Sequence, residues 1–300
     1  MIAALRIATR SSPLALWQAE FVAARLRESV PHLVIHLVRV DTHGDRTQAA
    51  NIALHTIGGQ GVFVKEVEMA VLDGRAEVAV HSAKDLPTQL VDGLMIAAVP
   101  EREDVRDAMV GSTIAGLPLG ARVATGSIRR RAQLAAIRPD LEFHELRGNM
   151  HTRIEKAKGF DAIVVGAAGL TRLGLGGHIA EFLGAEVMLP MVGQGAIAVE
   201  CRADDEELRA LLHAIDNFNH HATVRAERSF LGVLGSGCEL PVAALAEWSG
   251  DALRLRALVL AEDGSQVVRA DVLGTEPVAV GREAAGIVLR GGAAALLDRM

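Results

Sequence analysis

The sequence has few cysteines and few aromatic residues, and each shortage excludes a class of protein. Its 300 residues include two cysteines, Cys201 and Cys238, which cannot build a disulfide framework. Neither belongs to a Cys-x-x-Cys pair, so a structural zinc site is not predicted. Two tryptophans and no tyrosine provide little surface on which nucleic-acid bases could stack.

Long apolar runs and an excess of positive charge are also missing. No segment approaches the roughly 18 uninterrupted apolar residues of a membrane-spanning helix. Arg6 and Arg10 interrupt the apolar start, where a signal peptide would have its core. Half of the residues are hydrophobic, 23% are charged and the net charge is -6. This composition predicts a soluble, cytoplasmic globular protein and argues against a general nucleic-acid binder.

The order of apolar runs and helical patterns predicts an α/β protein with two or three domains. Strands that alternate with helices form parallel sheets, and the nearly continuous apolar run over 33–40 indicates a strand covered on both faces. Three later segments favour an antiparallel sheet in a smaller α+β domain, closed by a helix over 277–300. The expected strands cover residues 5–9, 33–40, 77–80, 122–125, 141–146, 161–165, 196–200, 242–247, 253–260 and 266–272, and the expected helices begin at Ser12-Pro13 and cover 62–72, 128–137, 149–158, 204–215 and 223–231.

Cys238 lies in the turn LGSGCELP, among small residues that leave a thiol open to reagents. On local grounds a passive thiol in a tight turn is favoured, because reactivity needs a particular electrostatic setting. The arginine-rich segments elsewhere reverse that preference, and we expect Cys238 to anchor something anionic. Cys201, within an expected strand, is interpreted as packed core.

Positive charge is concentrated between Arg122 and Lys158, where seven arginines and two lysines face four acidic residues. Thr125-Gly126-Ser127 stands between a strand and a helix, where free backbone N–H groups and the helix dipole favour an anion. Arginine forks bind carboxylates or phosphates in a bidentate way. The alternative is a solvated basic face with surface ion pairs. The arginines that would supply the site are Arg129, Arg130, Arg147 and Arg153.

A second group of polar residues follows the first strands. Arg10, Ser12, Lys84 and Asp85 each come just after a strand, and we expect them to converge on one crevice. Asp85 beside Lys84 is by itself more often a structural ion pair. Inside an arginine-lined site its carboxylate could stabilise a developing cation. His81 is given no catalytic role.

Eight blocks in order carry a resemblance to a known family: LRIATRSSPLALWQA, GGQGVFVKEVE, AVHSAKDLP, ATGSIRRRAQL, LRGNMHTR, AAGLTRLG, PMVGQGA with VECR, and GSGCELP. Over essentially its whole length the chain resembles porphobilinogen deaminase (hydroxymethylbilane synthase). The resemblance implies a transferase of tetrapyrrole and heme biosynthesis that joins four porphobilinogens head to tail into linear hydroxymethylbilane, releasing ammonia at each step. It also implies a dipyrromethane cofactor, made from substrate and held by a thioether to Cys238.

The resemblance implies roles for particular residues as well. Asp85 matches the catalytic aspartate. The matches to cofactor-binding residues are Ser82, Lys84, Thr125, Ser127, Arg129, Arg130 and Gly148. The matches to residues that hold the acetate and propionate groups of the substrate and growing chain are Arg10, Ser12, Arg147, Arg153, Arg172 and Gln194.

The implied architecture is two α/β domains of the type II periplasmic-binding-protein kind plus a smaller C-terminal α+β domain. The expected domains are 1–101 with 195–215, 102–194, and 216–300, with crossings near Glu101 and Gln194 that act as hinges. The implied form is a monomer that binds the small molecule porphobilinogen, with no metal, nucleic acid or membrane partner.

The chain departs from the family pattern in four places. Lysine is often found at the positions of Thr56 and Gln60, serine at that of Gly126, and glycine at that of Ser236. Two rival functions remain. One is a non-enzymatic binding protein for a small polyanion, which would share the fold but need no cysteine. The other is a nucleic-acid-binding module that uses the Arg122–Lys158 region.

Overall fold

The computed structural model describes residues 2–42, 64–235 and 240–297, and the predictions about Thr56, Gln60, Ser236 and Cys238 lie outside them. The chain forms two compact units. The first unit comprises Met1–Glu103 and Ala196–His221, and the second comprises Asp104–Gly195 and Ala222–Met300. The expected division into three domains stays a prediction.

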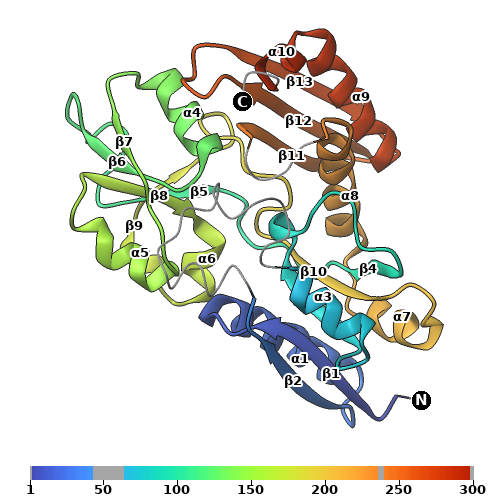
Figure 1. The fold of residues 1–300 in the computed structure, drawn as a ribbon. Helices are drawn as coiled ribbons and strands as arrows, with labels where there is room; N and C mark the ends of the chain where they lie inside the picture. The colour runs from blue at the N-terminus through green and yellow to red at the C-terminus, as the bar shows by residue number, and fades with distance from the viewer. Residues whose placement is uncertain (1, 43–63, 236–239, 298–300) are drawn as a thin grey trace. The chain divides into compact units, whose positions relative to one another are not determined.

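The first unit is built on a five-stranded sheet in the order β2-β1-β3-β10-β4. β1 is parallel to β2 and β3, whereas β10 is antiparallel to its neighbours β3 and β4. The late strand β10 therefore lies inside a sheet formed otherwise by the start of the chain (Figure 1). The bounds are β1 Ala4–Arg10, β2 Val34–Val40, β3 Val78–Ser82, β4 Leu94–Ala98 and β10 Ile197–Arg202.

Helices pack on both faces of this sheet. α1 (Pro13–Ser29) and α7 (Glu206–His213) bury apolar residues such as Leu26 and Leu212 on one face. α3 (Lys65–Leu72) packs Val67 and Val71 on the other. A short 3-10 turn, η2 (Ala83–Asp85), follows β3.

The prediction that the strand at 33–40 is covered on both faces is wrong. β2 is the edge strand of the sheet, and the side chain of Val34 is 51% exposed. His36 and Arg39, which interrupt the apolar run, are exposed as well. An apolar run can thus belong to an edge strand whose outer face is only partly covered.

The first sheet of the second unit has the order β7-β6-β8-β5-β9. β6 is parallel to β7 and β8, and β5 is antiparallel to β8 and β9. This order matches that of the first unit, with β5 in the place of β10. It is the arrangement of a type II periplasmic-binding-protein fold, so the predicted fold class is confirmed. The bounds are β5 Asp107–Val110, β6 Arg122–Ala124, β7 Glu142–His144, β8 Ala162–Gly166, β9 Ile179–Leu183, α4 Ile128–Ile137, α5 Met150–Ala157, α6 Ala167–Arg172 and the 3-10 turn η3 Gly176–His178.

The C-terminal part forms a separate antiparallel sheet in the order β11-β12-β13, as predicted. One face packs on Phe230 of α8 and Ala284 of α9. The other face contacts Ala132 of α4 and Leu189. This contact packs the two sheets of the second unit together. The bounds are α8 Phe218–Val233, β11 Val242–Ser249, β12 Ala252–Leu260, β13 Val267–Gly274, α9 Pro277–Arg290 and α10 Ala293–Leu297. Among the helices in the described residues, none has the length and apolarity needed to cross a bilayer.

Candidate active site

An open pocket lies in the first unit, where β1 and β3 end. Arg10, Ser12 and Asp85 line it, which confirms that these three side chains converge on one crevice. Lys84 is not among the residues that line this pocket. The other lining residues are Leu14, Ala15, Gln18, Val64, Val80, His81 and Ser82.

Local hydrogen bonds fix the walls of this pocket. Ser12 caps α1, and its hydroxyl accepts a hydrogen bond from the Ala15 N–H at 3.3 Å, as the Ser-Pro pattern predicts. The Ser82 hydroxyl accepts a hydrogen bond from Gln18 Nε2 at 2.8 Å. The Ala83 N–H donates to the Ala196 carbonyl at 3.0 Å. The half-buried Asp85 therefore stands on a turn that is tied to α1 and to the strand next to β3.

The second unit contains the predicted anion turn, Thr125-Gly126-Ser127, between β6 and α4. The Thr125 hydroxyl donates to the Val164 carbonyl at 3.3 Å and accepts from the Ser127 N–H at 3.3 Å. A β-carbon on Gly126 would lie 2.6 Å from the Leu146 carbonyl oxygen. The close approach requires glycine in this backbone, which gives the departure at Gly126 a structural reason.

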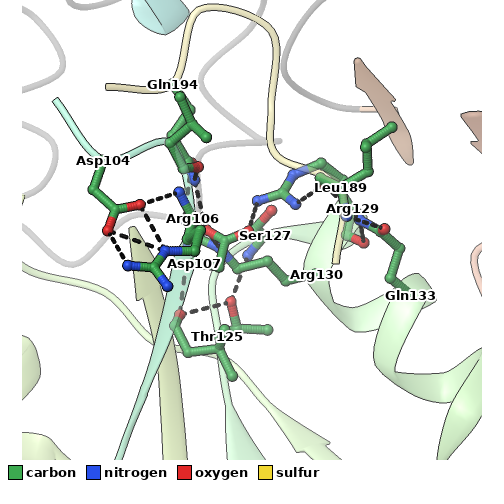
Figure 2. A network of polar contacts seen from close by, with 12 residues as sticks. Asp104, Arg106, Asp107, Thr125, Ser127, Arg129, Arg130, Gln133, Leu189 and Gln194 are labelled. Atoms are coloured by element: carbon green, nitrogen blue, oxygen red, sulfur yellow. Dashed lines mark hydrogen bonds and ion pairs between the residues drawn. The ribbon is translucent and has the colours of Figure 1, made fainter. Parts of the chain in front are cut away.

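Asp107, at the start of β5, is the centre of a buried network beside this turn (Figure 2). Its Oδ2 accepts from Arg129 Nη2 at 2.7 Å, and its Oδ1 accepts from Arg130 Nε and Gln194 Nε2, each at 2.9 Å. Arg129 Nη1 also donates to the Leu189 carbonyl at 2.6 Å. Burial by itself would raise the pKa of Asp107, but the charges of Arg129 and Arg130 outweigh it and lower that pKa to about 2.

The network changes the interpretation of three predicted ligand-binding residues. Arg129, Arg130 and Gln194 are all buried and all donate to Asp107. The alternative of a solvated basic face is therefore wrong for Arg129 and Arg130. Asp107 was not predicted as a site residue, because it closes the charged stretch Glu101–Asp107. A usable signal was its place directly before the apolar run Ala108-Met109-Val110.

The remaining predicted arginines also lie in the second unit, after strands. Arg153 Nε donates to the Gly148 carbonyl at 2.9 Å, and Arg147 lies 3.6 Å from Glu145. Gly148 has a φ of +118°, and a β-carbon there would lie 2.7 Å from Thr152 Cγ2, so the loop needs glycine. The buried Arg172, at the end of α6, donates to the Gly195 carbonyl at 2.7 Å.

Cys201 is buried in β10, as predicted, and burial raises the pKa of its thiol to about 11. A thiol protonated at neutral pH is a poor nucleophile, so Cys201 is not a candidate anchor. Cys238 lies outside the described residues, between α8 and β11. In the described part of the chain, no group of His, Cys, Asp and Glu side chains is arranged to hold a metal ion.

The first unit has a pocket lined by the carboxylate of Asp85 and the guanidinium of Arg10. The second unit has arginine side chains that follow its strands, and each of these features suits a ligand with acidic groups. The chain belongs to the porphobilinogen deaminase family. Residues 5–210 match the family model described as porphobilinogen deaminase, dipyromethane cofactor binding domain. Residues 221–289 match the model of the porphobilinogen deaminase C-terminal domain.

Relatives cover nearly the whole chain. The porphobilinogen deaminases of two strains of Acidithiobacillus ferrooxidans are each 46% identical over 299 residues, which is 98% of this chain and 97% of theirs. Among solved structures, the methionine-binding protein MetQ matches 73% of this chain and 92% of its own, at 12% identity and a TM-score of 0.43. The BenM effector-binding domain with its effector benzoate matches 71% and 90%, at 13% identity and a TM-score of 0.43.

The family assignment confirms the predicted enzyme class and the dipyrromethane cofactor. The donors of the second unit fit such a group, because acidic side arms need hydroxyl, backbone N–H and guanidinium donors. The Ser127 hydroxyl at the start of α4 and the guanidinium groups of Arg130, Arg147 and Arg153 supply these types. The roles of individual residues stay predictions.

Proposed function

We propose that the chain polymerises porphobilinogen into hydroxymethylbilane, with Asp85 as its catalytic carboxylate and Cys238 as the anchor of the dipyrromethane cofactor. The observation that carries this proposal is the pocket that Asp85 shares with Arg10 and Ser12. Arg10 and the Ser12 hydroxyl suit the acidic side arms of a pyrrole, while Asp85 suits a positively charged centre.

The cofactor, when bound, supplies the pyrrole to which substrate units are added. In the proposed assignment, Ser82 and Lys84 of the first unit and Thr125, Ser127, Arg129, Arg130 and Gly148 of the second hold it. Arg129 and Arg130 would act while paired with Asp107, which fixes the direction of both guanidinium groups. Arg147, Arg153, Arg172 and Gln194 would serve the substrate and the growing chain.

Asp85 acts on the step in which ammonia leaves porphobilinogen. The carbon–nitrogen bond breaks, its electron pair departs with nitrogen, and positive charge develops on the pyrrole and its methylene carbon. A fixed carboxylate stabilises that cation without reorganising solvent, which is the usual source of a large rate effect. The hydrogen bonds that hold the Ser82–Asp85 turn keep the carboxylate in place.

Intact-mass spectrometry of the purified protein tests the anchor. The mass should exceed that of the bare chain, and Cys238→Ala should abolish the excess while Cys201→Ala retains it. A purely reversible binding protein for a polyanion would show the bare mass in all three samples, and that result would exclude the proposal.

Asp85→Asn tests the catalytic role. We expect at least about a hundredfold loss of porphobilinogen turnover, since one well-placed electrostatic group contributes about 10²–10³-fold. The fold should remain, because Asp85 is half-buried on a turn. Asp92→Asn, an exposed acid of the same unit, is the control and should keep its turnover. Equal turnover in both variants would remove Asp85 from the mechanism.

A monomer in the cytoplasm is part of the same proposal. It comes from the family resemblance, which implies a monomer. Sedimentation should give the mass of one chain. A dimer at working concentration would contradict the monomer without affecting the chemistry.

A further inference from the structure

Three titratable side chains are buried together in the first unit. Glu68 of α3 is 2% exposed, His81 of β3 is 5% exposed and Glu200 of β10 is fully buried. His81 Nε2 lies 3.1 Å from Glu200 Oε2. Neither glutamate was singled out in the sequence, and His81 was given no role.

The sheet register explains how they meet. Ala198 pairs with His81 and Glu200 pairs with Ala79 in the antiparallel ladder of β3 and β10. Residues two apart on a strand share a face, so His81 and Glu200 point to the same side as Ala79. Ala79 packs in the cluster that contains Val67 of α3, the helix that also carries Glu68.

Burying these three ionisable side chains costs folding free energy. Within the described residues, Oε1 of Glu200 and Oε1 of Glu68 lack a hydrogen-bond partner, and His81 is the partner beside Oε2 of Glu200. Burial with too few donors disfavours the ionised form of Glu68. Burial, with a smaller contribution from the charge of Glu200, raises the pKa of Glu68 to about 7, against the opposing effect of His81. The cluster therefore gains one negative charge as the pH rises through neutrality.

His81 connects the cluster to the pocket that contains Asp85, since it is one of the lining residues. The other charged groups of that pocket are Arg10 and Asp85, on β1 and η2. β1, β2 and β10 also pack on α3. Of their remaining ionisable side chains, Arg6 is paired with Glu77, Arg202 donates to the Val71 carbonyl, and His36 and Arg39 are exposed. The charges that act on Glu68 are those of Glu200 and His81.

We propose that Glu68, His81 and Glu200 form a buried proton-holding cluster whose charge sets how strongly the Asp85 pocket binds a carboxylate-bearing substrate. The proposal rests on the proposed function for the identity of that substrate, porphobilinogen. Below neutral pH, Glu68 is protonated and adds no negative charge to the cluster. Above it, the added negative charge repels the acidic side arms of the substrate. These residues act through the pocket and are positioning residues.

The test is the pH dependence of KM for porphobilinogen between pH 6 and 8.5. In the wild-type enzyme, KM should rise about two- to tenfold through pH 7, the range for one unit charge acting over about 10 Å. Glu68→Gln removes the titration at nearly constant volume and should flatten the rise. Glu66→Gln, the same change two residues earlier on α3, is the control and should keep the wild-type profile. A profile unchanged in Glu68→Gln would overturn the proposal.

A second variant covers the case in which Glu68→Gln does not fold. Glu200→Gln removes the charge that helps to raise the pKa of Glu68. The rise in KM should then move to lower pH instead of disappearing. If the rise stays at the wild-type pH in this variant, the cluster does not control it.

An NMR titration of the Glu68 side-chain carboxyl carbon separates a failure of this inference from a failure of the proposed function. If the wild-type protein does not turn over porphobilinogen, the function fails and the cluster is judged by this titration alone. A step of the Glu68 carboxyl resonance near pH 7 supports the change of charge in the cluster. A Glu68 carboxyl that is already fully ionised at pH 6 contradicts it.

Discussion

The single carboxylate of Asp107 pairs with two buried guanidinium groups, and Gln194 donates a further hydrogen bond to it. The sequence predicts Arg129 and Arg130 as members of an anion site, because they open a helix after a strand. It does not predict Asp107 as their partner. The pairing depends on β5 entering the sheet antiparallel to β8, where Asp107 stands opposite Gly166. Such a long-range match is a property of the folded sheet.

Asp107→Asn should lower the free energy of unfolding by about 3–5 kcal/mol, since it leaves two buried cations with an amide as their only replacement. It should also reduce the share of cofactor-loaded chains in intact-mass spectra, because Arg129 and Arg130 lose their fixed direction. Urea unfolding at pH 7 measures the first effect. Asp104→Asn is the control: it breaks a pair with Arg106 that is 44% exposed on the arginine side, and should cost at most about 1 kcal/mol.

The wild-type protein and Asp107→Asn should also differ in how their stability responds to acid. The pKa of Asp107 falls from 3.8 to about 2 on folding. A carboxyl with a lowered pKa contributes stability that is complete above its unfolded pKa and lost as the pH falls through the folded one. The wild-type advantage over Asp107→Asn should therefore shrink by about 2 kcal/mol between pH 4.5 and 2. An advantage that stays constant over this range would mean that folding does not lower the pKa of Asp107.

At the scale of elements, local sequence patterns predict helices and their caps, but they do not predict very short elements or the place of a strand in its sheet. The helix expected over 128–137 is α4 with the same bounds, and Ser12 caps α1 as its sequence indicates. β4, β5, β9 and α6 were not predicted. These elements are only four to six residues long and are too short to show a period. The coverage of β2 depends on its place at the sheet edge, which no local pattern encodes.

Gly281 shows how a glycine inside a helix serves packing between elements. A β-carbon at Gly281 of α9 would lie 2.3 Å from the Ala226 carbonyl oxygen and 2.8 Å from the Phe230 nitrogen, both on α8. Gly281→Ala should separate the two helices and destabilise the protein by about 1–3 kcal/mol, the usual cost of overpacking. Thermal unfolding measures the change.

Gly286 on the same helix provides the matched control. A β-carbon there would meet the end of the Arg290 side chain at 3.1 Å, and that side chain can move away. Gly286→Ala should therefore be neutral or stabilise the protein by up to about 1 kcal/mol, because alanine favours the helix. The same substitution five residues apart should have opposite effects. Equal destabilisation by both would show that α8 does not control the cost.

At the scale of the whole molecule, the two sheets with the same strand order differ in how the chain builds them. All five strands of the sheet β7-β6-β8-β5-β9 come from residues 107–183. The sheet of the first unit needs β10, which lies almost a hundred residues after β4 and yet between β3 and β4. Alternation along the sequence predicts two α/β series but not this insertion, because β10 carries no local sign of its partners. The return of residues 195–215 to the first domain was expected from the family resemblance alone.

The difference predicts unequal folding of two fragments. A fragment of residues 104–195 retains its full sheet and should unfold cooperatively in urea. A fragment of residues 1–103 lacks β10, and β4 then has no strand to pair with, because its partner in the sheet is β10. It should lack a cooperative transition. Joining residues 196–221 to its end through a flexible linker should restore one, whereas joining 203–221, which omits β10, should not. Cooperative unfolding of 1–103 alone would show that β1, β2 and β3 with their helices suffice, and that the late strand only extends a sheet already formed.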